Sequence, residues 1–285
     1  MRNTKDIALE EAAIGTLVEL TGVFEGIASM RIAQIKNQVQ QATIFFDDLW
    51  GMYSQLRVDN LFRFGRSQDG VEVSEKTLYI IITAEGGFSG DIDLKLIKYM
   101  QRSYDKDKHD ILVIGHHGAV QLAQRGMSFI KYYKLPKKDE NINVTPIIHH
   151  VKQYAKTVVF YQEYVSLMVQ DVKKIELSAA VQDQGKGAGE AEEIISSSNT
   201  IFEPSVYAVI DHLESSMMQI AVSQLILNSK LAQYASRFRA MSASHTRAQD
   251  SKDDLRLELN RAKRAIKDQR LKEIINGMRK AGAGA

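Results

Sequence analysis

The sequence predicts an α/β fold in which long N- and C-terminal helices form an antiparallel coiled coil beside a central βαβ domain. Three observations carry this prediction. The stretch between Pro204 and Gly277 contains neither glycine nor proline and repeats apolar residues in heptads. A second heptad stretch without proline lies near the N-terminus, and two continuous apolar runs flank a glycine-rich turn between them.

The C-terminal stretch predicts one helix of unusual length. At about 1.5 Å per residue, a helix of about 70 residues is ~105 Å long, whereas the mean globular helix has only about 11 to 12 residues. Steps of four and three residues alternate, which predicts one partner helix along the whole seam. The seam consists of Leu227, Leu231, Tyr234, Phe238, Met241, His245, Ala248, Lys252, Leu255, Leu259, Ala262, Ile266 and Gln269.

The N-terminal stretch supplies the expected partner. Its seam has the same alternating steps and consists of Ala28, Ile32, Ile35, Val39, Ala42, Phe46, Leu49, Tyr53 and Leu56. Because the two stretches lie at opposite ends of the chain, they predict an antiparallel pair. Both apolar stripes are narrow, as a two-helix contact requires, whereas a helix packed on a globular core has a wider stripe. The alternative is separate amphipathic helices of an ordinary α/β domain.

The middle of the chain predicts a Rossmann-like βαβ unit. Leu78–Thr83 and Ile111–Gly115 are continuous apolar runs typical of buried parallel strands, and Ile92–Tyr104 between them has helical spacing. The glycines of Glu85–Asp91 allow a tight strand-to-helix turn.

Further elements follow in the same region. Ile147–Tyr154 is expected to be helical, Thr157–Tyr161 to form a strand and Val169–Leu177 to form an edge strand, while Gln182–Asn199 is small, polar and glycine-containing like a loop. The expected organisation is an N-terminal coiled-coil helix over residues 1–65, an α/β domain over 76–180, a linker over 181–203 and a C-terminal coiled-coil helix over 204–285.

The composition limits the possible functions. The chain has 285 residues, a formal net charge of +2 and no cysteine, so neither a disulfide nor a thiolate metal site can form. The first residues do not resemble a signal peptide, and no apolar window approaches the about 18 residues of a membrane span. The sequence therefore predicts a soluble protein of a reducing compartment.

No motif predicts catalysis or cofactor binding. Glu85–Asp91 (EGGFSGD) fits neither phosphate-binding glycine pattern, and Asp91 replaces the last glycine of a nucleophile elbow around Ser89. The pairs His116–His117 and His149–His150 lack carboxylates at ligand spacing and are expected in loops or on the surface. His245 is interpreted as a polar position that loosens or registers the coiled coil. We therefore predict no catalytic residue, no cofactor and no metal.

The C-terminal helix is basic, with Lys and Arg outnumbering Asp and Glu from residue 230 to residue 280. A basic helix can bind nucleic acid or an acidic protein surface, or can simply be solvated. Nucleic acid is disfavoured, because the basic residues carry no interleaved aromatic residues and the helix seam is committed to a partner.

Three stretches of the chain carry motifs of a known family. Ile81–Lys98 resembles the strand-loop-helix pattern V-V-S-T-D-R-G-L-C-G-G-L-N-x-N-L-F-K, and Phe202–Pro204 resembles a Y/F-E-P that opens a last helix. Phe238–Gly277 is similar to M-V-A-M-K-A-A-T-D-N…N-K-A-R-Q-A-x-I-T-Q-E-L-x-E-I-V-x-G. The matching positions there are Ala240, Met241, Asn260, Ala262, Gln269, Leu271, Glu273, Ile274 and Gly277. Together these stretches resemble the gamma subunits of F-type ATP synthases.

The departures from the family pattern mark a divergent member. The loop pattern S-T-D-R-G-L-C-G becomes TAEGGFSG over Thr83–Gly90, which changes its charges. The Arg-Gln pair of N-K-A-R-Q, which in the family meets a catalytic subunit, falls on Lys263 and Arg264, so charge is kept and the amide is lost. Ile27–Arg31 only echoes the family's A-A-S-K-M.

The resemblance implies a mechanical function. It implies a non-catalytic central-stalk rotor subunit that couples ion-driven rotation to conformational change at catalytic sites on neighbouring subunits. The implied partners are the alpha and beta subunits of the ATPase hexamer, the epsilon subunit and the membrane ring of c subunits, with the chain peripheral on the cytoplasmic face of a bacterial inner membrane. The partner contacts expected on the basic rod and its apolar tip are Arg261, Lys263, Arg264, Gln269, Ile274, Ile275 and Met278.

Two alternative functions stay open at this point. One is a coiled-coil scaffold or tether, including the central-stalk subunits of V/A-type rotary ATPases, although the βαβ unit counts against those. The other is a flavodoxin-like nucleotide-binding enzyme with helical extensions. Nucleotide binding by the isolated chain would favour the enzyme, and co-purification with an ATPase-active hexamer would favour the rotor.

Overall fold

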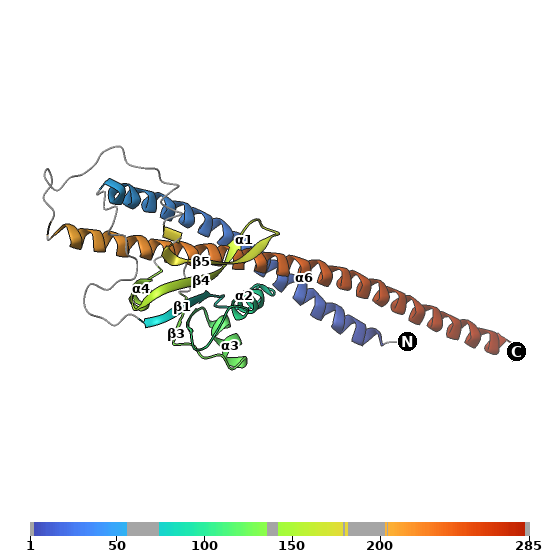
Figure 1. The fold of residues 1–285 in the computed structure, drawn as a ribbon. Helices are drawn as coiled ribbons and strands as arrows, with labels where there is room; N and C mark the ends of the chain where they lie inside the picture. Colours follow the sequence, from blue (N-terminus) through green and yellow to red (C-terminus); the bar gives the residue numbers. More distant parts are fainter. Residues whose placement is uncertain are drawn as a thin grey trace. The chain divides into compact units, whose positions relative to one another are not determined.

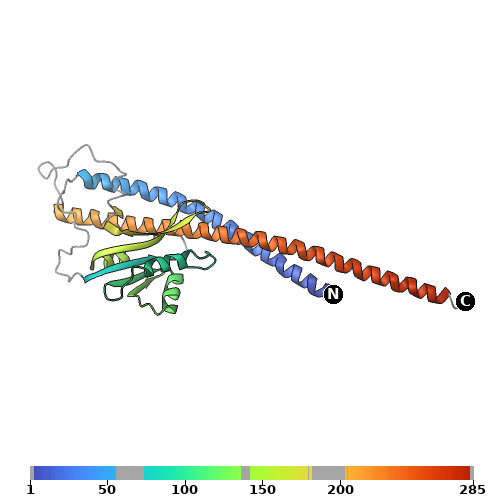
Figure 2. The same cartoon turned by 45° about the vertical axis from the view of Figure 1, so that its right-hand side comes forward.

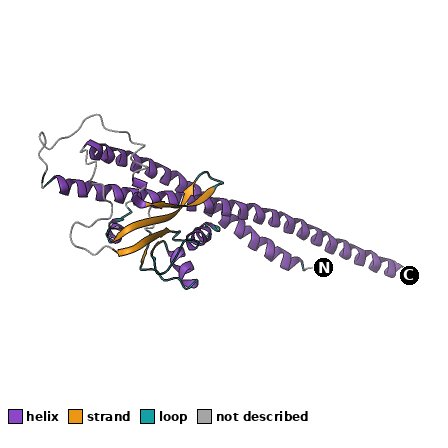
Figure 3. Cartoon of the chain, in the orientation of Figure 1, coloured by secondary structure: helices purple, strands orange, loops and turns teal. Residues whose placement is uncertain are grey.

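The computed structural model describes residues 3–55, 74–135, 142–178, 180–181, 203 and 205–282. Two long helices dominate it: α1 covers Thr4–Gln55 and α6 covers Val206–Gly282 (Figures 1 and 3). The chain divides into two compact units. We call Met1–Ile27 with Phe238–Ala285 the terminal unit and Ala28–Arg237 the central unit. No described helix combines the length and apolarity needed to cross a membrane.

A five-stranded sheet forms the middle of the central unit, in the order β3-β2-β1-β4-β5. Its strands are β1 (Ser74–Ile82), β2 (His109–Ile114), β3 (Lys131–Tyr133), β4 (Tyr154–Tyr164) and β5 (Gln170–Glu176). All neighbours pair in parallel except β4 and β5, which form an antiparallel hairpin at one edge. The predicted parallel βαβ unit and the predicted edge strand are therefore confirmed.

Helices cover both faces of the sheet, which explains why β1 and β2 are apolar without alternation. α2 (Ile92–Gln101) and α3 (His116–Gln124) pack on one face, where Ile81, Leu96 and Phe160 share a buried cluster. On the other face, α4 (Thr145–Val151) and the parts of α1 and α6 in this unit pack over a second cluster that includes Ile80 and Ala221. Figure 2 shows α6 running between α1 and the sheet in this unit.

Two elements escape the sequence prediction. β3 has only three residues and α3 begins with two histidines and a glycine, so neither has a distinct apolar pattern. The predicted helix Ile147–Tyr154 also ends earlier than expected, because Tyr154 is already the first residue of β4. The linker predicted over Gln182–Asn199 lies outside the described residues.

The predicted heptad seams are present in α1 and α6, except that Ile266 and Gln269 at the end of the α6 seam are exposed, and Leu56 lies outside the described residues. Ala28, Ile35 and Phe46 are almost fully buried in the central unit, and Met241, Ala248 and Leu259 are buried in the terminal unit. The pairing is antiparallel, since Gly15 lies against Lys252 and Gly22, one heptad later, lies against His245. The N-terminal seam begins well before the predicted Ala28. Its earlier positions, all buried or half-buried, are Ile7, Glu11, Ile14, Val18, Thr21 and Glu25.

The expectation of narrow stripes on both helices is wrong for α6 in the central unit. From Met217 to Ser236 this helix is buried on most of its circumference, because α1 packs on one side and the sheet on the other. The buried face of α6 is wider there because it also includes polar residues such as Ser229 and Gln233. Hydropathy alone does not identify these residues as buried.

Candidate functional site

The seven predicted contact residues all lie on the exposed last part of α6, in the terminal unit. Gly15 lies against Lys252 and the pairing is antiparallel. The start of α1 at Thr4 therefore lies opposite about residue 263 of α6. Beyond that point α6 has no partner within the described chain. All seven side chains are exposed, and no hydrogen bond or ion pair joins any of them to another described element; they are Arg261, Lys263, Arg264, Gln269, Ile274, Ile275 and Met278.

The end of α6 carries an apolar stripe. Leu271, Ile274, Ile275 and Met278 follow the spacing of one helix face, and Met278 is 71% exposed. The Gln269 side chain donates a hydrogen bond to Glu273 at 3.2 Å and thus stays on the helix surface. Contiguous exposed apolar side chains of this kind mark contact with another molecule.

A second exposed apolar row lies on α1, and the sequence analysis missed it. Leu17, Leu20, Phe24 and Ile27 are each at least one-third exposed and repeat in steps of three and four. Each stands one position before a residue of the buried seam, for example Leu17 before Val18. The signal was available in the sequence, because a second heptad pattern shifted by one residue predicts a helix with two apolar faces.

His245 is a polar position inside the helix pair of the terminal unit. Its Nδ1 lies 3.0 Å from the carbonyl oxygen of Val18 and 3.4 Å from the hydroxyl of Thr21. The backbone of Gly22 is also close to the ring. A directional contact at this place favours one register of the pair, which agrees with the interpretation of His245 as a registering residue. Within the described residues, no three His, Cys, Asp or Glu side chains group so as to hold a metal.

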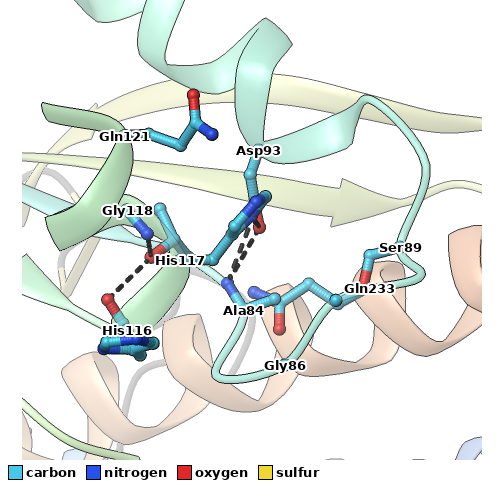
Figure 4. Close-up of polar contacts among 12 residues, drawn as sticks. Ala84, Gly86, Ser89, Asp93, His116, His117, Gly118, Gln121 and Gln233 are labelled. Carbon is cyan, nitrogen blue, oxygen red and sulfur yellow. Dashed lines mark hydrogen bonds and ion pairs between the residues drawn. The ribbon is translucent and has the colours of Figure 1, made fainter. Parts of the chain in front are cut away.

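A buried polar network occupies the carboxyl edge of the sheet in the central unit. At its centre is Asp93, near the start of α2 and only 1% exposed. Its carboxylate accepts hydrogen bonds from the Ala84 amide at 3.3 Å, from the Gln162 side chain at 2.7 Å and from His117, whose Nδ1 lies at 2.7 Å. Figure 4 shows His117 of α3 pointing at Asp93 beside the loop that follows β1.

His117 departs from the sequence expectation. The pair His116–His117 was expected in a loop or on the surface without carboxylate company, but it begins α3 and His117 contacts Asp93, which is distant in sequence. The hydrogen bond that His117 donates to Asp93 raises the pKa of His117 above its ordinary value, although partial burial opposes this. Single-sequence spacing could not reveal this pair, because the fold joins two different helix starts.

The network continues from β4 onto α6. The Gln162 amide oxygen accepts hydrogen bonds from the hydroxyl of Ser229 and from the side chain of Gln233 at 3.2 Å, and Gln233 also donates to Ser229 at 3.1 Å. All three side chains are at most 4% exposed. Each of these three buried side chains therefore has a polar partner, as a stable interior requires.

The loop after β1 is also bonded to α6. The Ser236 hydroxyl donates to the carbonyl oxygen of Ser89 at 2.7 Å. The Arg237 guanidinium donates to the carbonyl oxygens of Gly87 at 3.2 Å and Gly86 at 3.4 Å, and to the Ser89 hydroxyl at 3.0 Å. Burial lowers the pKa of Arg237, but an arginine remains charged throughout the physiological range.

Side-chain carboxylates accept hydrogen bonds from backbone amides in and beside this loop. Asp93 accepts from Ala84, and Glu85 accepts from the backbone amides of His116 at 3.1 Å and Leu135 at 3.2 Å. These are the groups that a phosphate would use in a nucleotide-binding turn. The arrangement is thus a structural joint between the sheet edge and α6.

Comparison with known proteins identifies similar chains. A family model described as ATP synthase matches residues 3–280. The ATP synthase gamma chain of Chlorobium phaeobacteroides (strain BS1) is 26% identical over 297 residues, which cover 97% of this chain and 98% of that one. The gamma chain of Desulfitobacterium hafniense (strain DSM 10664 / DCB-2) is 22% identical with the same coverage.

The fold is shared with a solved structure. A chain in the Euglena gracilis mitochondrial ATP synthase structure that comprises OSCP, F1 and the c-ring matches with a TM-score of 0.67. The two chains are 16% identical, and the match covers 99% of this chain and 96% of that one. The likeness therefore extends over the long helices as well as the sheet.

Proposed function

This chain belongs to the ATP synthase gamma-chain family, and we propose on that premise that it works as the central-stalk rotor subunit of an F-type ATP synthase. In this role it couples ion-driven rotation to conformational change at catalytic sites on neighbouring subunits. The observation that carries the proposal is the last part of α6, a long helix with open basic and apolar surfaces and no partner within the described chain. A passive tether or a flavodoxin-like enzyme does not account for the family match.

The chain itself performs no chemistry in this proposal. Rotation changes which side of the helix pair faces each catalytic site, and a site responds only if its conformations differ in contact free energy with that side. Arg261, Lys263 and Arg264 supply positive charge for acidic surfaces of the catalytic subunits. Ile274, Ile275 and Met278 supply an apolar tip that forms few directional bonds and therefore offers little resistance to turning.

The partners follow from the same role. The terminal unit contacts the alpha and beta subunits of the hexamer, and the exposed row Leu17, Leu20, Phe24 and Ile27 adds a contact surface on α1. The central unit contacts the epsilon subunit and the ring of c subunits. The complex places the chain peripherally on the cytoplasmic face of a bacterial inner membrane.

Replacing Lys263 and Arg264 by alanine tests the coupling surface. We expect the complex to assemble and its rate of ATP hydrolysis to fall, because the two charges contribute about 0.2–1 kcal/mol each where they stay solvated and more where partners desolvate them. The matched control removes the same charge from the turn before β2 in the central unit, as Lys106→Ala with Lys108→Ala. A hydrolysis rate and torque equal to those of the unmodified complex would remove Lys263 and Arg264 from the coupling surface.

A further inference from the structure

α6 meets the α/β domain through two different kinds of contact in the central unit. Its first contact stretch is apolar, with Met217, Ala221, Val222 and Ile226 buried on the sheet. The next stretch is polar and bonds through side chains to β4 and to the loop after β1. We call the polar stretch and its partners the polar clamp. It consists of Ser89, Gln162, Ser229, Gln233, Ser236 and Arg237.

The clamp residues of α6 lie on one helix face. Ser229, Gln233 and Ser236 are spaced by four and three residues, and Arg237 follows directly. Side chains with this spacing point the same way, so the whole row faces the sheet edge. The opposite side of the helix carries the seam toward α1, including Leu227 and Leu231. One side of α6 thus packs on α1, and the opposite side forms hydrogen bonds with the α/β domain.

The two stretches differ in what they resist. Apolar burial is non-directional, so small rotations or shifts of a helix on an apolar sheet face change its free energy little. Hydrogen bonds weaken steeply when distance and angle depart from ideal values, and a buried polar group left without its partner is costly. A turn of α6 about its axis would break the bonds from Gln233 to Gln162 and from Ser236 to Ser89 together.

The clamp is anchored deep in the domain. Gln162, which receives Ser229 and Gln233, itself donates to Asp93, and Asp93 holds Ala84 and His117. A force on α6 therefore reaches β4, α2, α3 and the loop after β1 through connected hydrogen bonds. The loop is also held in one shape, because Arg237 binds on both sides of Phe88, a non-glycine residue with a φ of 66°.

We propose that the polar clamp is the torque-bearing joint of this chain. It fixes the rotational and axial register of α6 on the α/β domain, so that rotation of the domain turns the helix instead of slipping beneath it. The residues of the clamp are positioning residues, since they touch no reacting group. This inference rests on the proposed function as a rotor subunit and names where within the chain the torque passes.

The test removes the hydrogen bonds that Gln233, Ser236 and Arg237 donate and keeps side chains of similar volume. The variant combines Gln233→Leu, Ser236→Ala and Arg237→Leu in the complete complex in membrane vesicles. ATP hydrolysis and uptake of the coupling ion are measured together, the latter with a pH-sensitive dye or radioactive sodium. We expect hydrolysis to persist and the uptake of ions per ATP hydrolysed to be lost, because the helix slips on the domain under load.

Two controls separate torque transmission from stability. Val222→Ala weakens the apolar contact of the same helix and should leave the ratio of uptake to hydrolysis unchanged in the complexes that assemble. Ser236→Thr keeps the hydroxyl donor and should couple better than Ser236→Ala. If the triple variant fails to assemble, this single-site pair decides the question.

Several outcomes would overturn one proposal or the other. Equal ratios for the clamp variants and the unmodified chain in a coupled complex would overturn the clamp alone. A Val222→Ala complex that uncouples as strongly as the triple variant would do the same. An unmodified chain that does not assemble with an ATP-hydrolysing hexamer would instead overturn the proposed function.

Discussion

The central and terminal units bury their residues in opposite ways. The central unit has two apolar clusters on the two faces of its sheet and a buried polar network with Asp93 at its centre. The terminal unit buries a single seam between two helices and leaves Leu271, Ile274 and Met278 exposed. The first arrangement covers its apolar side chains within the unit, whereas the second leaves apolar surface open to contact with other molecules.

This difference teaches that one helix can serve two purposes along its length. In the central unit α6 packs on the sheet and on α1, and its inward-facing polar residues form hydrogen bonds with β4 and with the loop after β1. In the terminal unit α6 carries its charges outward, as Arg261, Lys263 and Arg264 show. A coupling element needs both parts, because a surface that engages neighbours is useful only if its other end is held.

The largest expected effect comes from the core of the central unit. Ile80→Ala removes a fully buried side chain from β1 and should lower the free energy of unfolding by about 2–5 kcal/mol, through lost burial and a residual cavity. Urea unfolding of the complete chain, followed by circular dichroism, measures it. A loss below about 1 kcal/mol would mean that the sheet does not determine the stability of this unit.

Glu214 gives a smaller effect of opposite sign. This half-buried carboxyl on α6 has its pKa raised from 4.5 to about 7, first by burial and then by repulsion from Asp211, while Lys152 opposes the shift. The folded chain therefore binds an extra proton between these values, and the stability that Glu214 contributes falls as the pH rises through that window.

Glu214→Gln should therefore raise the free energy of unfolding at about pH 8 by about 1–2 kcal/mol, after allowance for partial exposure. The gain should shrink as the pH falls from about 7 and should vanish well below about 4.5, where the carboxyl is protonated in both states. Urea unfolding at several pH values measures the difference, with Glu19→Gln on the exposed side of α1 as the control. A gain that does not vary with pH would contradict the assigned cause.

His117 should give a still smaller pH dependence in the same direction, although replacing this side chain lowers the stability instead of raising it. Its pKa is raised by the hydrogen bond that it donates to Asp93, so its stabilising contribution is complete below the ordinary histidine pKa and is lost as the pH rises through the raised value. His117→Gln should therefore cost more at about pH 5.5 than at about pH 8.5. His149→Gln, on the exposed side of α4, is the control and should show no such trend.

The sequence predicts most of the elements of this fold but little of the joint between them. Heptads and apolar runs reveal α1, α6, β1, β2 and β4, because those patterns result from burial on one face or on all faces. The clamp escapes such reasoning, since Gln162, Ser229 and Gln233 are polar and become neighbours only through the sheet order. His117 and Asp93 escape it for the same reason, because the starts of α2 and α3 meet at the carboxyl edge of the parallel sheet.

The exposed row on α1 escapes for another reason. Leu17 and Leu20 belong to a detectable heptad pattern. A search for a single narrow seam finds the buried heptad pattern and overlooks the second one, which is shifted by one residue. The seven residues predicted as partner contacts could be placed on exposed α6 from their pattern alone. What each one touches depends on other chains, so their roles stay predictions.

The smallest expected effect lies at the end of α6 and sharpens the comparison most. Ile274→Ala should change the free energy of unfolding of the isolated chain by less than about 0.5 kcal/mol, because the side chain is 59% exposed and packs on no other described element. In the assembled complex, Ile274→Ala should lower the temperature of dissociation if the apolar tip turns against neighbouring subunits, since the change then removes buried apolar area. Urea unfolding of the isolated chain and thermal dissociation of the complex measure the two states. A clear loss of stability in the isolated chain would show that the terminal unit is self-sufficient, and the contrast between the two units would disappear.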